Sequence, residues 1–67
     1  MDYNFTPMEN LVVTLLCEGK GLTKIAKKLN RSHETIRGQF TNCMQKTDTH
    51  SQLELAVKIL REMYDVR

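Results

Sequence analysis

The 67-residue sequence is poor in the residues that build disulfide, metal and membrane structures. It has only two cysteines, Cys17 and Cys43, which stand far apart without a CxxC pair. Their apolar neighbours predict small buried side chains rather than a disulfide framework or a zinc site. No apolar segment approaches the ~20 residues that span a bilayer, and the N-terminal MDYNFTP lacks the apolar core of a secretion signal. We therefore expect a cytoplasmic protein that binds no metal, cofactor or membrane.

Groups that would support catalysis are also scarce. A domain of this length has no room for a deep substrate cavity together with the walls that would hold it. His33 and His50 have no carboxylate or cysteine at a helical spacing that would form a catalytic dyad. Cys17 lacks the basic neighbour or helix N-terminus that would lower the pKa of its thiol. The sequence therefore predicts no catalytic residue and no enzyme.

Charge is unevenly distributed, although the net charge is only +2. The charged residues among the first 18 are all acidic, whereas residues 20–37 contain one acidic residue, Glu34, and six basic ones. The basic residues are Lys20, Lys24, Lys27, Lys28, Arg31 and Arg37. A basic side on a small domain suits a polyanion such as a nucleic acid. Charge alone is equally consistent with an ordinary solvated face.

Apolar residues recur at helical spacing in four segments, and no segment shows strand alternation. We predict an all-α domain with four helices over residues 7–18, 22–29, 33–46 and 52–64. Thr6 and Glu9 are spaced as a capping box at the start of the first helix, with proline at its first position. Ser51 and Glu54 have the same spacing before the last helix.

The second and third helices are joined by a very short turn. Asn30 is a candidate for the left-handed residue that ends the second helix. Only Asn30 and Arg31 then precede Ser32, which can cap the third helix. Two helices joined in this way, with their apolar faces inward, predict helix-turn-helix geometry.

The third helix has an unusual polar face. Its apolar stripe consists of Ile36, Phe40, Cys43 and Met44, and the opposite face consists of Glu34, Arg37, Gly38, Thr41, Asn42 and Gln45. Arginine, threonine, asparagine and glutamine form directional hydrogen bonds with base edges, and a glycine allows close approach of another molecule. We predict that this helix reads the major groove of double-stranded DNA.

The last helix carries two apolar stripes. One consists of Leu53, Ala56, Val57, Leu60 and Tyr64, and the other consists of Leu55, Ile59 and Met63. One stripe is sufficient to dock the helix on so small a core, so we predict that the second stripe forms a homodimer interface. The alternative is that both stripes pack inside the monomer.

The ordered set of motifs resembles the LuxR/GerE-type helix-turn-helix DNA-binding domain over residues 5–57. The matching residues are Thr6, Pro7 and Glu9, Leu15, Leu16, Glu18 and Gly19, Ile25, Ala26 and Leu29, Ser32, Thr35, Ile36, Arg37, Asn42 and Lys46, and Ser51, Leu53, Glu54, Ala56 and Val57. The resemblance implies a four-helix domain whose third helix enters the major groove and whose fourth helix often pairs two copies.

The resemblance also implies roles for individual residues. Thr35 and Lys46 would contact phosphates. Arg37, Gly38 and Thr41 would lie nearest the bases, and Arg37 could donate two hydrogen bonds to guanine. The complete set of predicted DNA-binding residues is Lys20, Lys24, Arg31, Ser32, Thr35, Arg37, Gly38, Thr41, Asn42, Gln45 and Lys46, and the predicted dimer interface is Leu55, Ile59 and Met63.

Two features leave a second function open. Gly38 costs helix stability, about 1 kcal/mol relative to alanine, and the last helix has apolar surface to spare. Only four residues precede the matching region, so we expect a stand-alone domain without a regulatory domain. The leading hypothesis is a sequence-specific transcription regulator. The alternative is a protein-interaction module that docks on RNA polymerase or on a larger LuxR-type regulator without binding DNA.

Overall fold

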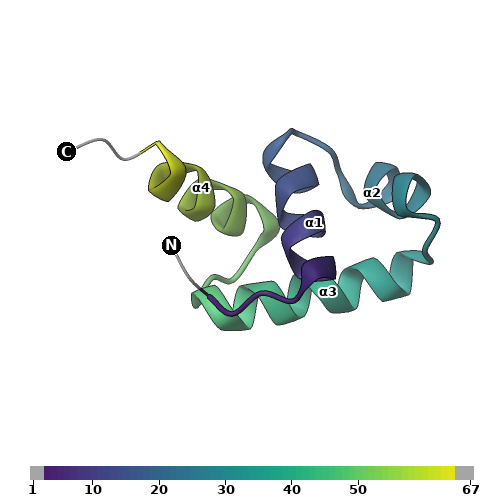
Figure 1. Ribbon diagram of the computed structural model, residues 1–67, viewed down its shortest axis with the longest axis horizontal. Helices are drawn as coiled ribbons and strands as arrows, with labels where there is room; N and C mark the ends of the chain where they lie inside the picture. Colours follow the sequence, from purple (N-terminus) through teal and green to yellow (C-terminus); the bar gives the residue numbers. More distant parts are fainter. Residues whose placement is uncertain (1–2, 65–67) are drawn as a thin grey trace.

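A computed structural model describes residues 3–64 and places four α-helices around a shared core (Figure 1). The helices are α1 (Pro7–Cys17), α2 (Leu22–Leu29), α3 (His33–Thr47) and α4 (Gln52–Met63). Within residues 3–64 there is no strand, so the predicted all-α class is confirmed. The observed ends differ from the predicted ones by one residue in α1, α3 and α4.

Local capping explains where the outer helices begin. The Thr6 hydroxyl accepts from the Glu9 amide at 3.1 Å, and the Thr6 amide donates to Glu9 Oε1 at 2.9 Å, which completes the predicted capping box. At α4 only half of the predicted box forms, because Glu54 Oε1 accepts from the His50 amide at 2.8 Å instead of the Ser51 amide. The Ser51 hydroxyl still caps the Glu54 amide at 3.0 Å.

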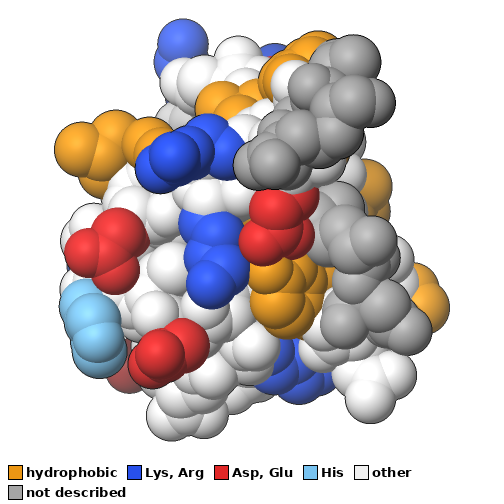
Figure 2. Space-filling model, turned by 90° about the vertical axis from the view of Figure 1, so that its left-hand side faces the viewer, with side chains coloured by type: hydrophobic (Ala, Val, Ile, Leu, Met, Phe, Trp, Pro, Cys, Tyr) orange, Lys and Arg blue, Asp and Glu red, His pale blue; other side chains and the backbone are white. Residues whose placement is uncertain are grey.

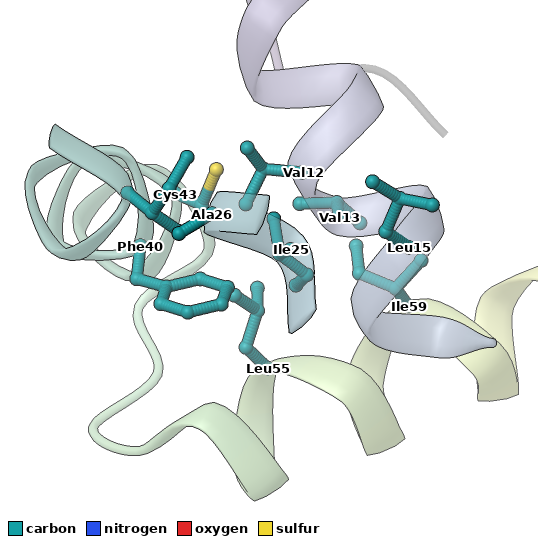
Figure 3. Close-up of a cluster of buried hydrophobic side chains, with 10 residues drawn as sticks. Val12, Val13, Leu15, Ile25, Ala26, Phe40, Cys43, Leu55 and Ile59 are labelled. Atoms are coloured by element: carbon teal, nitrogen blue, oxygen red, sulfur yellow. The ribbon is translucent and has the colours of Figure 1, made fainter. Parts of the chain in front are cut away.

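The core is built around α1, which packs against each of the other three helices. In Figure 1, α3 crosses α1 near the beginning of α1, and α2 and α4 lie on opposite sides of α1, toward opposite ends of α3. The buried apolar side chains form one cluster (Figure 3): Val12, Val13, Leu15, Ile25, Ala26, Ile36, Phe40, Cys43, Leu55 and Ile59. α3 is therefore supported by α1 where the two helices cross, by α2 toward its start and by α4 toward its end.

The orientation of α4 is opposite to the predicted one. Leu55 and Ile59 are 0% and 2% exposed, and in Figure 3 Leu55 points toward Phe40 of α3. Leu53 and Tyr64, from the stripe that was expected to dock, are 75% and 72% exposed. The prediction that Leu55 and Ile59 form a dimer interface is therefore wrong, because the core of the monomer already covers them. Both stripes are apolar, so the periodicity alone did not distinguish them.

Met63, the third residue of the predicted interface, is 56% exposed, which leaves it free to contact another molecule. The alternative that both stripes pack inside is also wrong, since Leu53, Val57 and Tyr64 of the other stripe are exposed and only Ala56 and Leu60 are half-buried. None of the helices within residues 3–64 is long and apolar enough to cross a membrane.

Candidate nucleic-acid interface

The turn between α2 and α3 is rigidly defined by hydrogen bonds. Asn30 adopts the predicted left-handed conformation, with φ of 56°. The Arg31 amide then donates to the Ala26 carbonyl at 2.9 Å, which closes the end of α2. The Ser32 hydroxyl accepts from the Thr35 amide at 3.1 Å and starts α3. α2 and α3 thus have the short, fixed connection of a helix-turn-helix unit.

The polar face of α3 is entirely exposed to solvent. Glu34, Arg37, Gly38, Thr41, Asn42 and Gln45 are all exposed, whereas Ile36, Phe40 and Cys43 on the other side are buried. The Thr41 hydroxyl donates to the Arg37 carbonyl at 3.1 Å and can still accept a hydrogen bond from a partner. The arrangement provides several hydrogen-bonding groups along one accessible helix face.

Gly38 lies in the middle of this face, and neither packing nor backbone conformation within the protein requires glycine there. A Cβ atom built on Gly38 would meet no atom within 4 Å outside its own helical turn. Its φ is not positive, so its backbone conformation does not require glycine either. The helix therefore accepts an unfavourable residue at a position where the described chain offers room for a side chain.

Within the described residues, exposed cations without a salt bridge lie on α2, on the turn and on α3. Lys24, Lys27, Lys28 and Arg31 are exposed on α2 and the turn, and Arg37 is exposed on α3. Among residues 3–64, none of these five side chains forms a salt bridge. Lys20 differs, because its ammonium lies 3.1 Å from Glu18 Oε1 in an exposed pair that contributes little to stability. Positive charge at this end of the molecule is therefore available to a polyanion.

The other end of the molecule has a different surface. Figure 2 shows this end, where acidic, basic and apolar side chains alternate around α4. A shallow depression here is lined by Asp48, Thr49, Glu54, Val57, Lys58, Arg61 and Glu62. Opposite charges lie side by side, so this surface does not favour a polyanion over other partners.

Lys46 already has partners in the free protein. Its ammonium lies 2.6 Å from Glu9 Oε1 and donates to the Asn4 carbonyl at 2.9 Å. Its hydrogen bond to Glu9, helped by the bond from the Thr6 amide, holds the pKa of the Glu9 carboxyl below its ordinary value. In the free protein Lys46 thus forms an ion pair between α3 and α1, and its contact with phosphate stays a prediction.

The remaining predicted DNA-binding residues are accessible at the surface to different degrees. Lys24 is exposed on α2, Arg31, Ser32 and Thr35 are exposed at the turn and the start of α3, and Lys20 is half-buried beyond the end of α1. The Ser32 hydroxyl also donates to the Thr35 hydroxyl at 2.9 Å, so these two groups form one polar cluster at the start of α3. Contact of any of these residues with DNA stays a prediction.

The sequence prediction missed the outward face of α4. Leu53 and Val57 are exposed, and a shallow groove beside Leu53 is lined by Leu16, Gly21, Ala56 and Leu60. Exposed apolar surface of this kind is typical of protein contacts. The signal was present in the sequence as a second apolar stripe, but it was assigned to the core.

Neither cysteine has the environment of a reactive thiol. Burial raises the pKa of Cys43 to about 11 and also raises the pKa of Cys17. Both thiols are free, with Cys43 buried and Cys17 half-buried. In the part of the chain that the structure describes, no group of three or more histidine, cysteine, aspartate or glutamate residues could hold a metal ion.

Comparison with known proteins places this arrangement in a wider group. The model of the family described as bacterial regulatory proteins, luxR family, matches residues 3–59. The transcriptional regulatory protein RcsB of Escherichia coli K12 is 41% identical over 54 residues, which cover 81% of this chain and 25% of RcsB. The RcsB proteins of Shigella flexneri and Salmonella typhi give the same values.

A second kind of relative is the uncharacterized response regulatory protein YgeK of E. coli K12. It is 35% identical over 60 residues, which cover 90% of this chain and 41% of YgeK. The chain thus spans about a quarter of the length of RcsB and less than half of YgeK. No solved structure matched the chain.

Proposed function

Because the chain belongs to the LuxR family of bacterial regulatory proteins, we propose that it is a sequence-specific DNA-binding transcription regulator. α3 enters the major groove, and α2 with the turn lies along the phosphate backbone. The observation that carries this proposal is the exposed polar face of α3 bordered by cations that have no acidic partner within residues 3–64. The similarity to RcsB, a transcriptional regulatory protein, supports it.

Arg37 is the residue with the strongest capacity to select a base. Its guanidinium is exposed and unpaired among the described residues, so it can donate two parallel hydrogen bonds to O6 and N7 of guanine. Thr41, Asn42 and Gln45 follow on the same face and read bases more permissively. Gly38 lies between these groups and lets the groove approach the helix backbone.

The start of α3 is suited to a phosphate. The first amides of a helix have no acceptor within the helix, and the helix dipole favours negative charge there. The hydroxyls of Ser32 and Thr35 lie at this position, and Arg31 precedes them. Lys24 on α2 adds a second backbone contact and long-range attraction.

The proposal is tested by comparing two cation variants on an operator selected from random DNA. Arg37→Ala should cost ~1–3 kcal/mol of binding free energy on that operator and relax the base preference at one position. Lys24→Ala is the matched control, because loss of a phosphate contact should weaken binding to all sequences about equally. Binding of Arg37→Ala as tight as that of the wild type would remove the proposed role of Arg37.

We further propose that two copies associate through the outward face of α4, with Leu53 and Val57 at its centre. The sequence had suggested Leu55 and Ile59 for this interface, but both are buried in the monomer. Dimers of helix-turn-helix domains bind two half-sites spaced by the helical repeat of DNA. Leu53→Asp should leave the monomer folded, reduce dimer formation in sedimentation experiments and weaken binding to a two-half-site operator. An unchanged monomer in both proteins would contradict the dimer.

The same apolar face favours a second candidate function. A protein-interaction module could use Leu53 and Val57 to dock on RNA polymerase or on a larger LuxR-type regulator. Its DNA-facing surface would then be unused. This candidate predicts that no specific DNA complex forms at any salt concentration.

A further inference from the structure

The end of α3 is attached to two separate segments by one side chain. The Lys46 ammonium donates to Glu9 Oε1 in the first turn of α1 and to the backbone carbonyl of Asn4, which precedes that helix. The two acceptors are 37 and 42 positions away in the sequence. Lys46 therefore joins the last turn of α3 to the beginning of the chain.

The carboxylate that receives Lys46 is fixed in place. Glu9 Oε1 also accepts from the Thr6 amide at 2.9 Å as part of the α1 capping box. The Glu9 side chain is 4% exposed, whereas the Lys46 side chain is 32% exposed. Glu9 is thus the immobile partner, and the position of Lys46 is set by it.

The segment before α1 is held as well. The Tyr3 hydroxyl donates to Glu62 Oε2 on α4 at 2.5 Å, and this bond raises the Tyr3 pKa to about 12. The rings of Tyr3 and Phe5 lie 5.5 Å apart, on either side of Asn4. The Asn4 carbonyl is therefore presented to Lys46 from a segment that also contacts α4.

The two ends of α3 have independent attachments. At the first end, the three residues Asn30, Arg31 and Ser32 join α3 to α2. At the last end, the Thr47 hydroxyl bonds to the Cys43 carbonyl at 2.9 Å and lies 2.9 Å from the Thr49 hydroxyl, inside the helix terminus. Lys46 adds a charged attachment to α1 at this end, and the direction of the helix axis depends on both ends.

We propose that Lys46 is a positioning residue, which fixes the angle at which α3 enters the groove and does not contact DNA phosphate. This inference rests on the proposed DNA binding. Lys46 already uses two of its three N–H donors on Glu9 and Asn4. A phosphate that drew the ammonium away from Glu9 would leave the buried carboxylate without its charged partner. Leaving a buried charge without its partner is strongly unfavourable. The ion pair is therefore kept when DNA binds.

The test compares binding at several salt concentrations, because each neutralised phosphate contributes to the salt dependence. Wild type, Lys46→Met, Glu9→Gln and the control Lys24→Met are titrated against the same selected operator. Lys24→Met should reduce the slope of log affinity against log salt by about one. Lys46→Met should leave this slope unchanged and weaken binding by the same factor at every salt concentration.

Glu9→Gln distinguishes a positioning role of Lys46 from a phosphate contact, because the two roles predict different changes in DNA affinity. Glu9 is too buried to contact DNA, so its substitution should weaken binding as Lys46→Met does, and the double variant should lose no more than either single variant. If Lys46 binds phosphate, Glu9→Gln frees it, and affinity is unchanged or higher. Circular dichroism melting shows whether each variant is folded at the titration temperature.

The outcomes are distinct. If the slope of log affinity against log salt falls by about one in Lys46→Met, the positioning role is overturned. Should Glu9→Gln fail to fold, the slope of Lys46→Met alone decides between a positioning role and a phosphate contact. Undiminished affinity in a folded Glu9→Gln variant also overturns it. Absence of any specific complex with the wild type would instead overturn the proposed function, and the role of Lys46 with it.

Discussion

The end of the molecule that contains α2 and the end that contains α4 differ in the charge and polarity of their surfaces. Around α2 and the start of α3, cations are exposed and have no acidic partner among the described residues. Around α4, acidic and basic side chains alternate, and Leu53 and Val57 present an apolar surface. The first surface suits a polyanion and the second suits a protein. A domain of 67 residues can thus offer two kinds of partner surface from one small core.

The same contrast exists within α3. Arg37 and Lys46 are both cations of one helix, but Arg37 has no salt-bridge partner in residues 3–64, whereas Lys46 is bound to Glu9 and Asn4. Charge alone therefore does not identify a nucleic-acid contact. What matters is whether the charge already has a partner in the free protein.

The largest expected effect concerns the orientation of α4. Leu55→Ala should destabilise the fold by ~2–5 kcal/mol, because it removes a fully buried side chain and leaves a cavity near Phe40. Leu53→Ala on the same helix is the matched control and should change stability by no more than about 0.5 kcal/mol. Urea unfolding measures both. Equal losses for the two variants would mean that α4 does not present a distinct outer face.

A smaller effect is expected at Gly38, and it has opposite signs in folding and binding. Gly38→Ala should stabilise the free protein by about 1 kcal/mol, because alanine favours the helix and its Cβ meets nothing. The same methyl group should weaken binding to the selected operator if the groove approaches this point closely. Melting temperature and operator affinity are measured on the same preparation. Unchanged or tighter DNA binding would show that close approach does not require the glycine.

The smallest expected effect is a pH dependence of the stability that the Glu9–Lys46 ion pair contributes to the fold. The pKa of Glu9 is lowered in the folded state from its ordinary value, chiefly by the hydrogen bond from Lys46. Its ion pair therefore stabilises the fold above that value, and the stabilisation is lost as the pH falls through the lowered pKa. Glu9→Gln lacks this contribution. The difference in urea midpoint between the two proteins should shrink as the pH is lowered from about 7 to about 3, and a constant difference would contradict the assignment.

The sequence predicted local structure well because the signals are local. Thr6 with Glu9, Asn30 and Ser32 act within a few residues of themselves, so they mark helix ends without knowledge of the fold. The polar face of α3 follows from the same kind of short-range periodicity. These features were enough to predict the four helices, the turn and the exposed candidate DNA-binding face.

Features that depend on distant partners were not predictable. The two stripes of α4 are both apolar, and the choice of Leu55 and Ile59 for the core depends on how α4 meets α1 and α3. The attachment of Lys46 joins residues 37 positions apart, and no spacing rule relates them. Both features concern which surface remains free after packing.

The most direct test of the proposed function is the salt dependence of wild-type binding to an operator selected from random DNA. Log affinity should fall linearly with log salt concentration, by ~0.9 for each phosphate contacted, and the selected sequences should share a common motif. A protein that gives no specific complex at any salt concentration would contradict DNA reading by α3. It would leave the apolar face of α4 as the functional surface.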